Sequence, residues 1–163
     1  MHFNIKESLT YLNKYKIKKF VDGDGIILED IFSKKEIEVR FYGLDAPELK
    51  YCNKVKNDEK VLQLPASLLI ELGNLSFNFL MQQAKIGETC TLIQEKGNEK
   101  DKYGRTLGYV ILNDGQVLND IMIKEGYAKP YNEVFCEMLP QYQEWNLEAK
   151  INKKGLFSRV NYF

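Results

Sequence analysis

The stretch KIKKFVDGDGIILEDIFSKKEIEVRF, from Lys16 to Phe41, decides the fold class of this chain. It holds three apolar-rich runs that are separated by two polar turns. In the last run, apolar Ile37, Val39 and Phe41 alternate with charged residues, which is the two-residue period of a half-buried strand. The first turn is built on Gly23–Gly25, a Gly-Asp-Gly sequence typical of tight turns. The stretch therefore predicts three consecutive strands.

The rest of the chain adds a helix, two more strands and two helices. We expect the helix at Pro65–Ala84, strands at Thr89–Gln94 and Thr106–Leu112, and helices at Val117–Glu125 and Leu139–Lys153. Five strands with a helix between the third and the fourth is the order of an OB-type barrel, a fold often used to hold nucleic acid. The predicted fold is therefore mainly β within the α+β class: a five-stranded OB-fold barrel with about three helices. Fold alone does not give function.

The N-terminal residues differ from this pattern. Ile5, Leu9, Leu12 and Tyr15 lie at helical spacing, so we expect a short helical extension over residues 1–15, followed by one domain over residues 16–163. The start of the chain has no apolar run with a small-residue cleavage site. We therefore expect a cytoplasmic protein, or a secreted one if the chain is a processed form.

Composition excludes several classes of function. The 163 residues are 44% hydrophobic, and 23 basic residues balance 23 acidic ones, so a broad positive surface for nucleic acid is absent although a local cleft is not excluded. No apolar run approaches the roughly 20 residues that span a membrane. The one histidine, His2, nearly excludes catalysis or metal binding through histidine. The cysteines at 52, 90 and 136 form no Cys-x-x-Cys pair, so we expect free thiols.

Carboxylates gather beside two predicted turns. Asp22 and Asp24 flank a glycine at the end of the first strand, where carboxylate oxygens suit a hard cation, although a plain Asp-Gly turn is the better explanation of that segment taken alone. Asp45 and Glu48 follow the third strand, and two such carboxylates can divide metal binding and proton transfer between them. A solvated acidic loop is the alternative explanation for this second pair.

Cationic residues occur near the same strand ends. Arg40 lies on the third strand, and the segment Asp101–Arg105 presents a lysine, a phenol and a guanidinium just before the fifth strand. The planar guanidinium fork matches phosphate oxygens, and a tyrosine can hydrogen-bond a phosphate or stack on a base. A charged hairpin loop is the simpler interpretation of the segment by itself.

Taken in order, these segments resemble the signature blocks of the staphylococcal nuclease family. The blocks are DGD at Asp22–Asp24, Arg40 with DAPE at Asp45–Glu48, and DKYGR at Asp101–Arg105. GYAK at Gly126–Lys129 resembles a weaker fourth block, and KGLF at Lys154–Phe157 is similar to the usual family ending. The resemblance extends over about residues 16–158, nearly the whole chain.

The resemblance implies a Ca²⁺-dependent nuclease that cuts DNA and RNA on the 5′-oxygen side of the phosphodiester and leaves 3′-phosphates. Asp24, Asp45 and the carbonyl of Ala46 would bind Ca²⁺, Glu48 would be the general base, and Arg40 and Arg105 would stabilise the charged transition state. Lys102 and Tyr103 would hold a substrate phosphate, and Tyr131 is the candidate for base stacking, with a core or surface role as its alternative. We expect a monomer that favours single strands and does not bind membranes.

Three features depart from the family pattern. Gly25 and Ala46 replace residues that are often threonine, which we expect to modulate metal affinity without abolishing it. The segment Leu49–Leu64 is longer than the family pattern, and it could be an ordered lid, a disordered loop or a specificity element. Two alternatives to the enzyme are a catalytically silent nucleic-acid or protein-binding module on the same barrel and a structural Ca²⁺-binding protein. Because Arg40, Glu48 and Arg105 are all retained, the nuclease is favoured over both.

Overall fold

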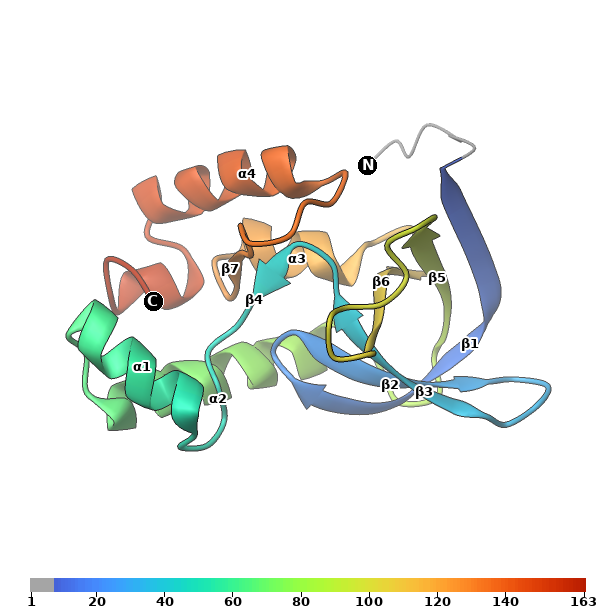
Figure 1. The fold of residues 1–163 in the computed structure, drawn as a ribbon, viewed down its shortest axis with the longest axis horizontal. Coiled ribbons are helices and arrows are strands. Elements are labelled where there is room, and N and C mark those ends of the chain that lie inside the picture. Colours follow the sequence, from blue (N-terminus) through green and yellow to red (C-terminus); the bar gives the residue numbers. More distant parts are fainter. Residues whose placement is uncertain (1–7) are drawn as a thin grey trace.

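The computed structural model describes residues 8–163, and five of its strands form a closed barrel with the helices gathered to one side (Figure 1). The strands follow one another around the barrel in the order β1-β2-β3-β6-β5, with β3 and β6 parallel and the other neighbours antiparallel. Their bounds are Leu9–Asp22 (β1), Gly25–Asp30 (β2), Glu36–Phe41 (β3), Thr89–Glu95 (β5) and Thr106–Leu112 (β6). This confirms the predicted OB-type barrel.

The helical prediction for the N-terminal extension is wrong where the structure describes it. Leu9 and Tyr15 are buried in β1, which runs without a break across the expected boundary between residues 15 and 16. The pairing of β1 with β5 shifts register between Leu12 and Tyr15. Such a bulge adds one residue to the strand, so apolar residues three apart can face the same core and imitate helical spacing. Ile5 lies outside the described residues.

Within residues 8–163, four α-helices and one short 3-10 helix pack beside the barrel (Figure 1). Their bounds are Asn53–Leu62 (α1), Ala66–Gln83 (α2), Leu118–Lys124 (α3), Leu139–Ile151 (α4) and Gly155–Ser158 (η1). The predicted helices correspond to α2, α3 and α4. The helix α1 was not predicted, and it forms most of the segment Leu49–Leu64. Figure 1 shows α1 and α2 on one side of the barrel and α4 beyond α3.

A second, two-stranded sheet connects the barrel to the C-terminal helices. It consists of β4 (Leu44–Asp45) and β7 (Lys129–Pro130), and Asp45 pairs with Lys129. Just before β4, Gly43 has a φ of +71°, and a side chain there would collide with Cys136 and Tyr142. The chain therefore leaves the barrel after β3 in a sharp bend, which brings Asp45 back to the end of β1.

The core fills the barrel and the space between the barrel and the helices. Ile17, Ile26, Leu28, Val39 and Leu92 are completely buried inside it. Beneath α4, the phenol of Tyr109 donates a hydrogen bond of 2.6 Å to Glu95. All three cysteines are free thiols, as expected, with Cys52 exposed and the other two buried.

Within residues 8–163, no single helix is long and apolar enough to cross a membrane. The helices α1 and α2 pass that test only as a pair, which is bent by 112° at its break.

Candidate active site

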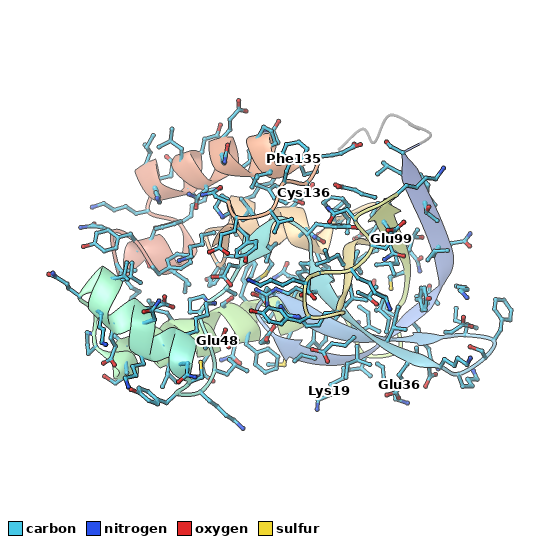
Figure 2. All side chains as sticks on the ribbon, viewed as in Figure 1. Lys19, Glu36, Glu48, Glu99, Phe135 and Cys136 are labelled. Carbon is cyan, nitrogen blue, oxygen red and sulfur yellow. The ribbon has the colours of Figure 1, made fainter. Side chains whose placement is uncertain are left out.

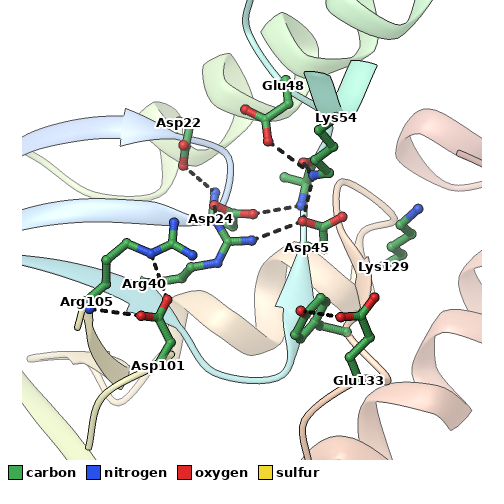
Figure 3. Close-up of polar contacts among 12 residues, drawn as sticks. Asp22, Asp24, Arg40, Asp45, Glu48, Lys54, Asp101, Arg105, Lys129 and Glu133 are labelled. Atoms are coloured by element: carbon green, nitrogen blue, oxygen red, sulfur yellow. Dashed lines mark hydrogen bonds and ion pairs between the residues drawn. The ribbon is translucent and has the colours of Figure 1, made fainter. Parts of the chain in front are cut away.

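A buried ion-pair cluster lies where β1, β3 and β4 end, and Arg40 is at its centre (Figure 3). The Nη1 of Arg40 donates to Oδ1 of Asp24 at 2.9 Å, and its Nη2 donates to Oδ1 of Asp45 at 3.0 Å. The two aspartates are only 3% and 7% exposed. Because buried carboxylates need a charged or hydrogen-bonding partner, one guanidinium holds both in place.

The turn between β1 and β2 positions Asp24. Its backbone amide donates to Oδ1 of Asp22 at 3.1 Å, and its own Oδ2 accepts a hydrogen bond of 3.0 Å from the amide of Ala46. A side chain at position 23 would collide with Ser76 and Ala46, so only glycine fits between the two aspartates. The Gly-Asp-Gly turn is therefore both a tight turn and part of the charged site.

Glu48 lies three residues after Asp45, beside α1 and α2 and away from Lys19 on β1 and Glu36 on β3 (Figure 2). Its backbone carbonyl presses against Gly73 of α2, where a Cβ atom would overlap it. Glu48 is part-exposed, so its carboxylate can reach water. Gly73 thus sets the position of Glu48, a role that the sequence patterns did not reveal because a helical glycine carries no such signal.

Lys54, from the first turn of α1, lies among the oxygens of the acidic segment Asp45–Glu48 (Figure 3). Its Nζ is 2.7 Å from Oδ1 of Asp45, 3.1 Å from the carbonyl oxygen of Ala46 and 3.2 Å from Oε1 of Glu48. Lys54 was not among the predicted site residues because it lies outside the family blocks, in the segment Leu49–Leu64 that is longer than the family pattern. A lysine in an ordinary surface helix has no motif that marks it.

The electrostatics of the cluster follow from burial opposed by pairing. Burial raises the pKa of the Asp24 carboxyl, and the Arg40 guanidinium opposes that shift. For Lys54, burial by itself lowers the pKa, but the charge and hydrogen bond of Asp45 outweigh it and raise the pKa above its ordinary value. Lys54 is therefore a cation in this site.

The acceptors around Lys54 are oxygens, the donor type that a hard cation prefers. Oxygens of Asp45, Ala46 and Glu48 converge on one positive atom, and carboxylate and carbonyl oxygens are the ligands that Ca²⁺ prefers. Asp24, the other predicted metal ligand, directs its oxygens to Arg40 and to the amide of Ala46. No group of three or more His, Cys, Asp or Glu side chains in residues 8–163 is arranged to hold a metal ion. The oxygens that surround Lys54 thus come from two carboxylates, Asp45 and Glu48, and from the carbonyl of Ala46.

The Arg105 loop, residues Asp101–Arg105, is the second cationic element. Arg105 donates through Nε to Oδ2 of Asp101 at 2.7 Å, and Oδ1 of Asp101 accepts from the amides of Tyr103 and Arg105. Parallel pairing of Val39 with Thr106 brings this loop beside β3, and Figure 3 shows Arg105 next to Arg40. The structure thus brings together both predicted arginines.

The predicted substrate-binding residues lie around this pair of arginines. Lys102 Nζ and Arg105 Cζ are 5.2 and 5.5 Å from the centre of the Tyr103 ring, which is 72% exposed. Tyr131 follows β7, and its hydroxyl donates to Glu133 at 2.8 Å. The hydrogen bond to Glu133, followed by burial and the nearby charges of Glu133 and Asp45, raises the pKa of Tyr131. Tyr131 is therefore a part-buried residue within electrostatic reach of the site.

Comparison with known proteins identifies the family. The model of the family described as staphylococcal nuclease homologue matches residues 38–159, so the chain belongs to this family. It is similar to a thermonuclease of Staphylococcus intermedius, with 29% identity over 85% of this chain and 74% of that one.

Two further relatives extend the range of the family. An uncharacterized protein of Methanocaldococcus jannaschii is 29% identical over 90% of this chain and 72% of its own length. Endonuclease YhcR of Bacillus subtilis is 32% identical over 87% of this chain, which matches only 11% of that longer protein.

Proposed function

We propose that this protein is a Ca²⁺-dependent nuclease that hydrolyses phosphodiester bonds of DNA and RNA. Family membership and the relatives named as nucleases support the general class. One observation carries the proposal: Arg40 and Arg105 lie together at one end of the barrel (Figure 3). The carboxylate of Glu48 and the oxygens of Asp45 and Ala46 lie beside them (Figure 3).

The two arginines would bind the phosphate. A phosphodiester repels an attacking water, so its negative charge must be offset before the reaction can occur. Arg40 uses two of its five N–H donors on Asp24 and Asp45, which leaves donors for substrate. Arg105 is held from behind by Asp101 and is more exposed. Positioned donors of this kind contribute about 100- to 1000-fold each.

Glu48 would accept the proton from the attacking water. A general base must be accessible to water, and the side chain of Glu48 is 31% exposed, whereas Asp24 and Asp45 are buried. Bound Ca²⁺ would supply positive charge next to the phosphate and would be held by Asp45 and the Ala46 carbonyl, with Asp24 behind them. Lys102 and Tyr103 would hold a neighbouring phosphate, and Tyr131 would stack on a base.

We further propose cleavage on the 5′-oxygen side, with 3′-phosphate products, by a monomer that prefers single strands. The exposed Tyr103 supports the last point, because a base can stack on an open ring only when it is not already stacked in a duplex.

The test is cleavage of single-stranded DNA by the purified protein in Ca²⁺ or in a chelator. We expect Ca²⁺-dependent cleavage that falls at least about 100-fold in Glu48→Gln and Asp45→Asn. Glu38→Gln is the matched control. Glu38 is an exposed glutamate on β3, so its loss should leave the cleavage rate unchanged. DNA binding without cleavage would instead make the protein a binding module of the same fold.

A further inference from the structure

Lys54 places a positive charge where the proposed metal would bind. Its ammonium donates hydrogen bonds to Oδ1 of Asp45 at 2.7 Å and to the carbonyl oxygen of Ala46 at 3.1 Å, and it forms an ion pair with Oε1 of Glu48 at 3.2 Å. These include two of the oxygens assigned to Ca²⁺ and one of the proposed general base. The ammonium therefore occupies the place among these oxygens that a metal ion would need.

A metal and this ammonium cannot share the site. Ca²⁺ binds oxygens at about 2.3–2.6 Å, so an ion held by Asp45 and Ala46 would lie within a few ångströms of Nζ. Two positive charges at such a separation repel strongly where the surroundings are partly buried. Metal binding thus requires Lys54 to leave, and the bound lysine lowers the apparent metal affinity.

The Lys54 side chain can move while its helix stays in place. A lysine ends in a compact charge on a flexible four-carbon stem, so Nζ can withdraw without backbone change. Val55 is the one buried residue of α1, and Lys54 itself keeps 34% of its side chain exposed. Solvent is therefore open to the displaced ammonium.

We propose that Lys54 is a built-in competitor for the metal, occupying the site without Ca²⁺ and displaced when Ca²⁺ binds. The inference rests on the proposed Ca²⁺-dependent function, and it adds a regulatory step to it. In the metal-free protein, Lys54 neutralises Asp45 and also engages Glu48. One displacement therefore loads the metal and releases the general base, so that base and metal become available together.

The first test measures Ca²⁺ affinity by titration calorimetry, without substrate. We expect Lys54→Met, which keeps the length of the stem and removes the charge, to bind Ca²⁺ at least ten-fold more tightly than the wild type. Lys56→Met is the matched control: Lys56 is exposed on the same helix, and its loss should leave affinity unchanged. Asp45→Asn should abolish binding in either background, which ties the signal to this site.

The second test follows Lys54 directly, by acetylation of lysines and mass spectrometry of the wild type. We expect Lys54 to be protected in a chelator and labelled in Ca²⁺, with Lys56 labelled equally in both. Unchanged Ca²⁺ affinity in Lys54→Met, with unchanged labelling of Lys54, would overturn the inference but leave the nuclease standing if cleavage still needs Ca²⁺. Cleavage that persists in chelator and is lost in Lys54→Met would make Lys54 a permanent substitute for the metal, and would overturn both proposals.

Discussion

The two predicted arginines occupy contrasting environments. Arg40 is 20% exposed and lies between two buried aspartates, which it holds together. Arg105 is 38% exposed, and its one ion-pair partner in residues 8–163, Asp101, belongs to its own loop. Arg40 thus joins distant parts of the fold, whereas Arg105 is held only by its own loop; in the proposed function both would also bind the substrate phosphate.

This contrast follows from chain topology. Arg40 lies near the end of a barrel strand, facing a turn and a bend that come from elsewhere in the chain, so its guanidinium joins segments that are 16 and 5 residues away. Arg105 ends a local loop whose hydrogen bonds span at most four residues. Long-range contacts make a residue important for stability, whereas a local loop can change with little effect on the fold.

The largest effect should come from Arg40→Ala. We expect cleavage to fall at least about 1000-fold, because a phosphate donor is lost. The free energy of unfolding should also fall by about 3–5 kcal/mol, because Asp24 is left buried without its cation. Cleavage assays and urea unfolding measure the two effects. An unfolding free energy equal to that of the wild type would show that the cluster does not stabilise the fold.

Arg105→Ala should separate activity from stability. We expect a fall in cleavage of about 100- to 1000-fold, and a change in unfolding free energy of less than about 1 kcal/mol, as for an exposed ion pair. The same two assays apply. If Arg105→Ala destabilises the protein as much as Arg40→Ala does, the contrast between the two arginines is lost.

Asp120 is a second carboxyl whose pKa is raised by burial, as that of Asp24 is, but it lies outside the arginine cluster. Burial raises the pKa of Asp120 to about 6, although Tyr142 donates a hydrogen bond to it at 3.0 Å. A raised carboxyl pKa means that the folded state binds the proton more tightly, so stability is lost as pH rises from about 4 to 6. Between pH 4 and pH 7, the unfolding free energy of the wild type should fall by roughly 2 kcal/mol more than that of Asp120→Asn. Parallel pH profiles of the two proteins would contradict this expectation.

The smallest effect concerns Tyr103 in the Arg105 loop. Tyr103→Ala should raise KM for single-stranded DNA by about 5- to 10-fold, which corresponds to the low end of the roughly 1–3 kcal/mol that base stacking contributes, and it should leave the free energy of unfolding unchanged. Tyr103→Phe keeps the ring and serves as the control: a KM close to wild type assigns the effect to stacking, and a KM like that of Tyr103→Ala assigns it to the hydroxyl.

Much of the fold could be predicted from the sequence, because alternating runs and turn residues mark strands locally. The strand Thr106–Leu112 has the predicted bounds, and α2 lies within one residue of its prediction at each end. The N-terminal strand was mistaken for a helix because a bulge, which depends on pairing with β5, changes the spacing of apolar residues. Such a contact is not visible in the segment itself.

The residues of the site that lie in the family blocks could be predicted from the sequence. Arg40, Asp45 and Glu48 come together with Asp24 and Arg105 as the blocks suggested, although their chemical roles stay predictions. Lys54 and Gly73 could not be found in this way. Lys54 acts through helix α1, whose place against the acidic segment is a tertiary property, and Gly73 acts through the space that it leaves for Glu48.

The most direct measurement is the chemical identity of the ends left on a single-stranded DNA oligonucleotide, by the wild type in Ca²⁺ and in chelator and by Glu48→Gln in Ca²⁺. We expect 3′-phosphate and 5′-hydroxyl ends from the wild type in Ca²⁺ alone, and almost no product from the variant. Products with 3′-hydroxyl ends, or equal cleavage in chelator and by Glu48→Gln, would contradict the proposed chemistry of the site.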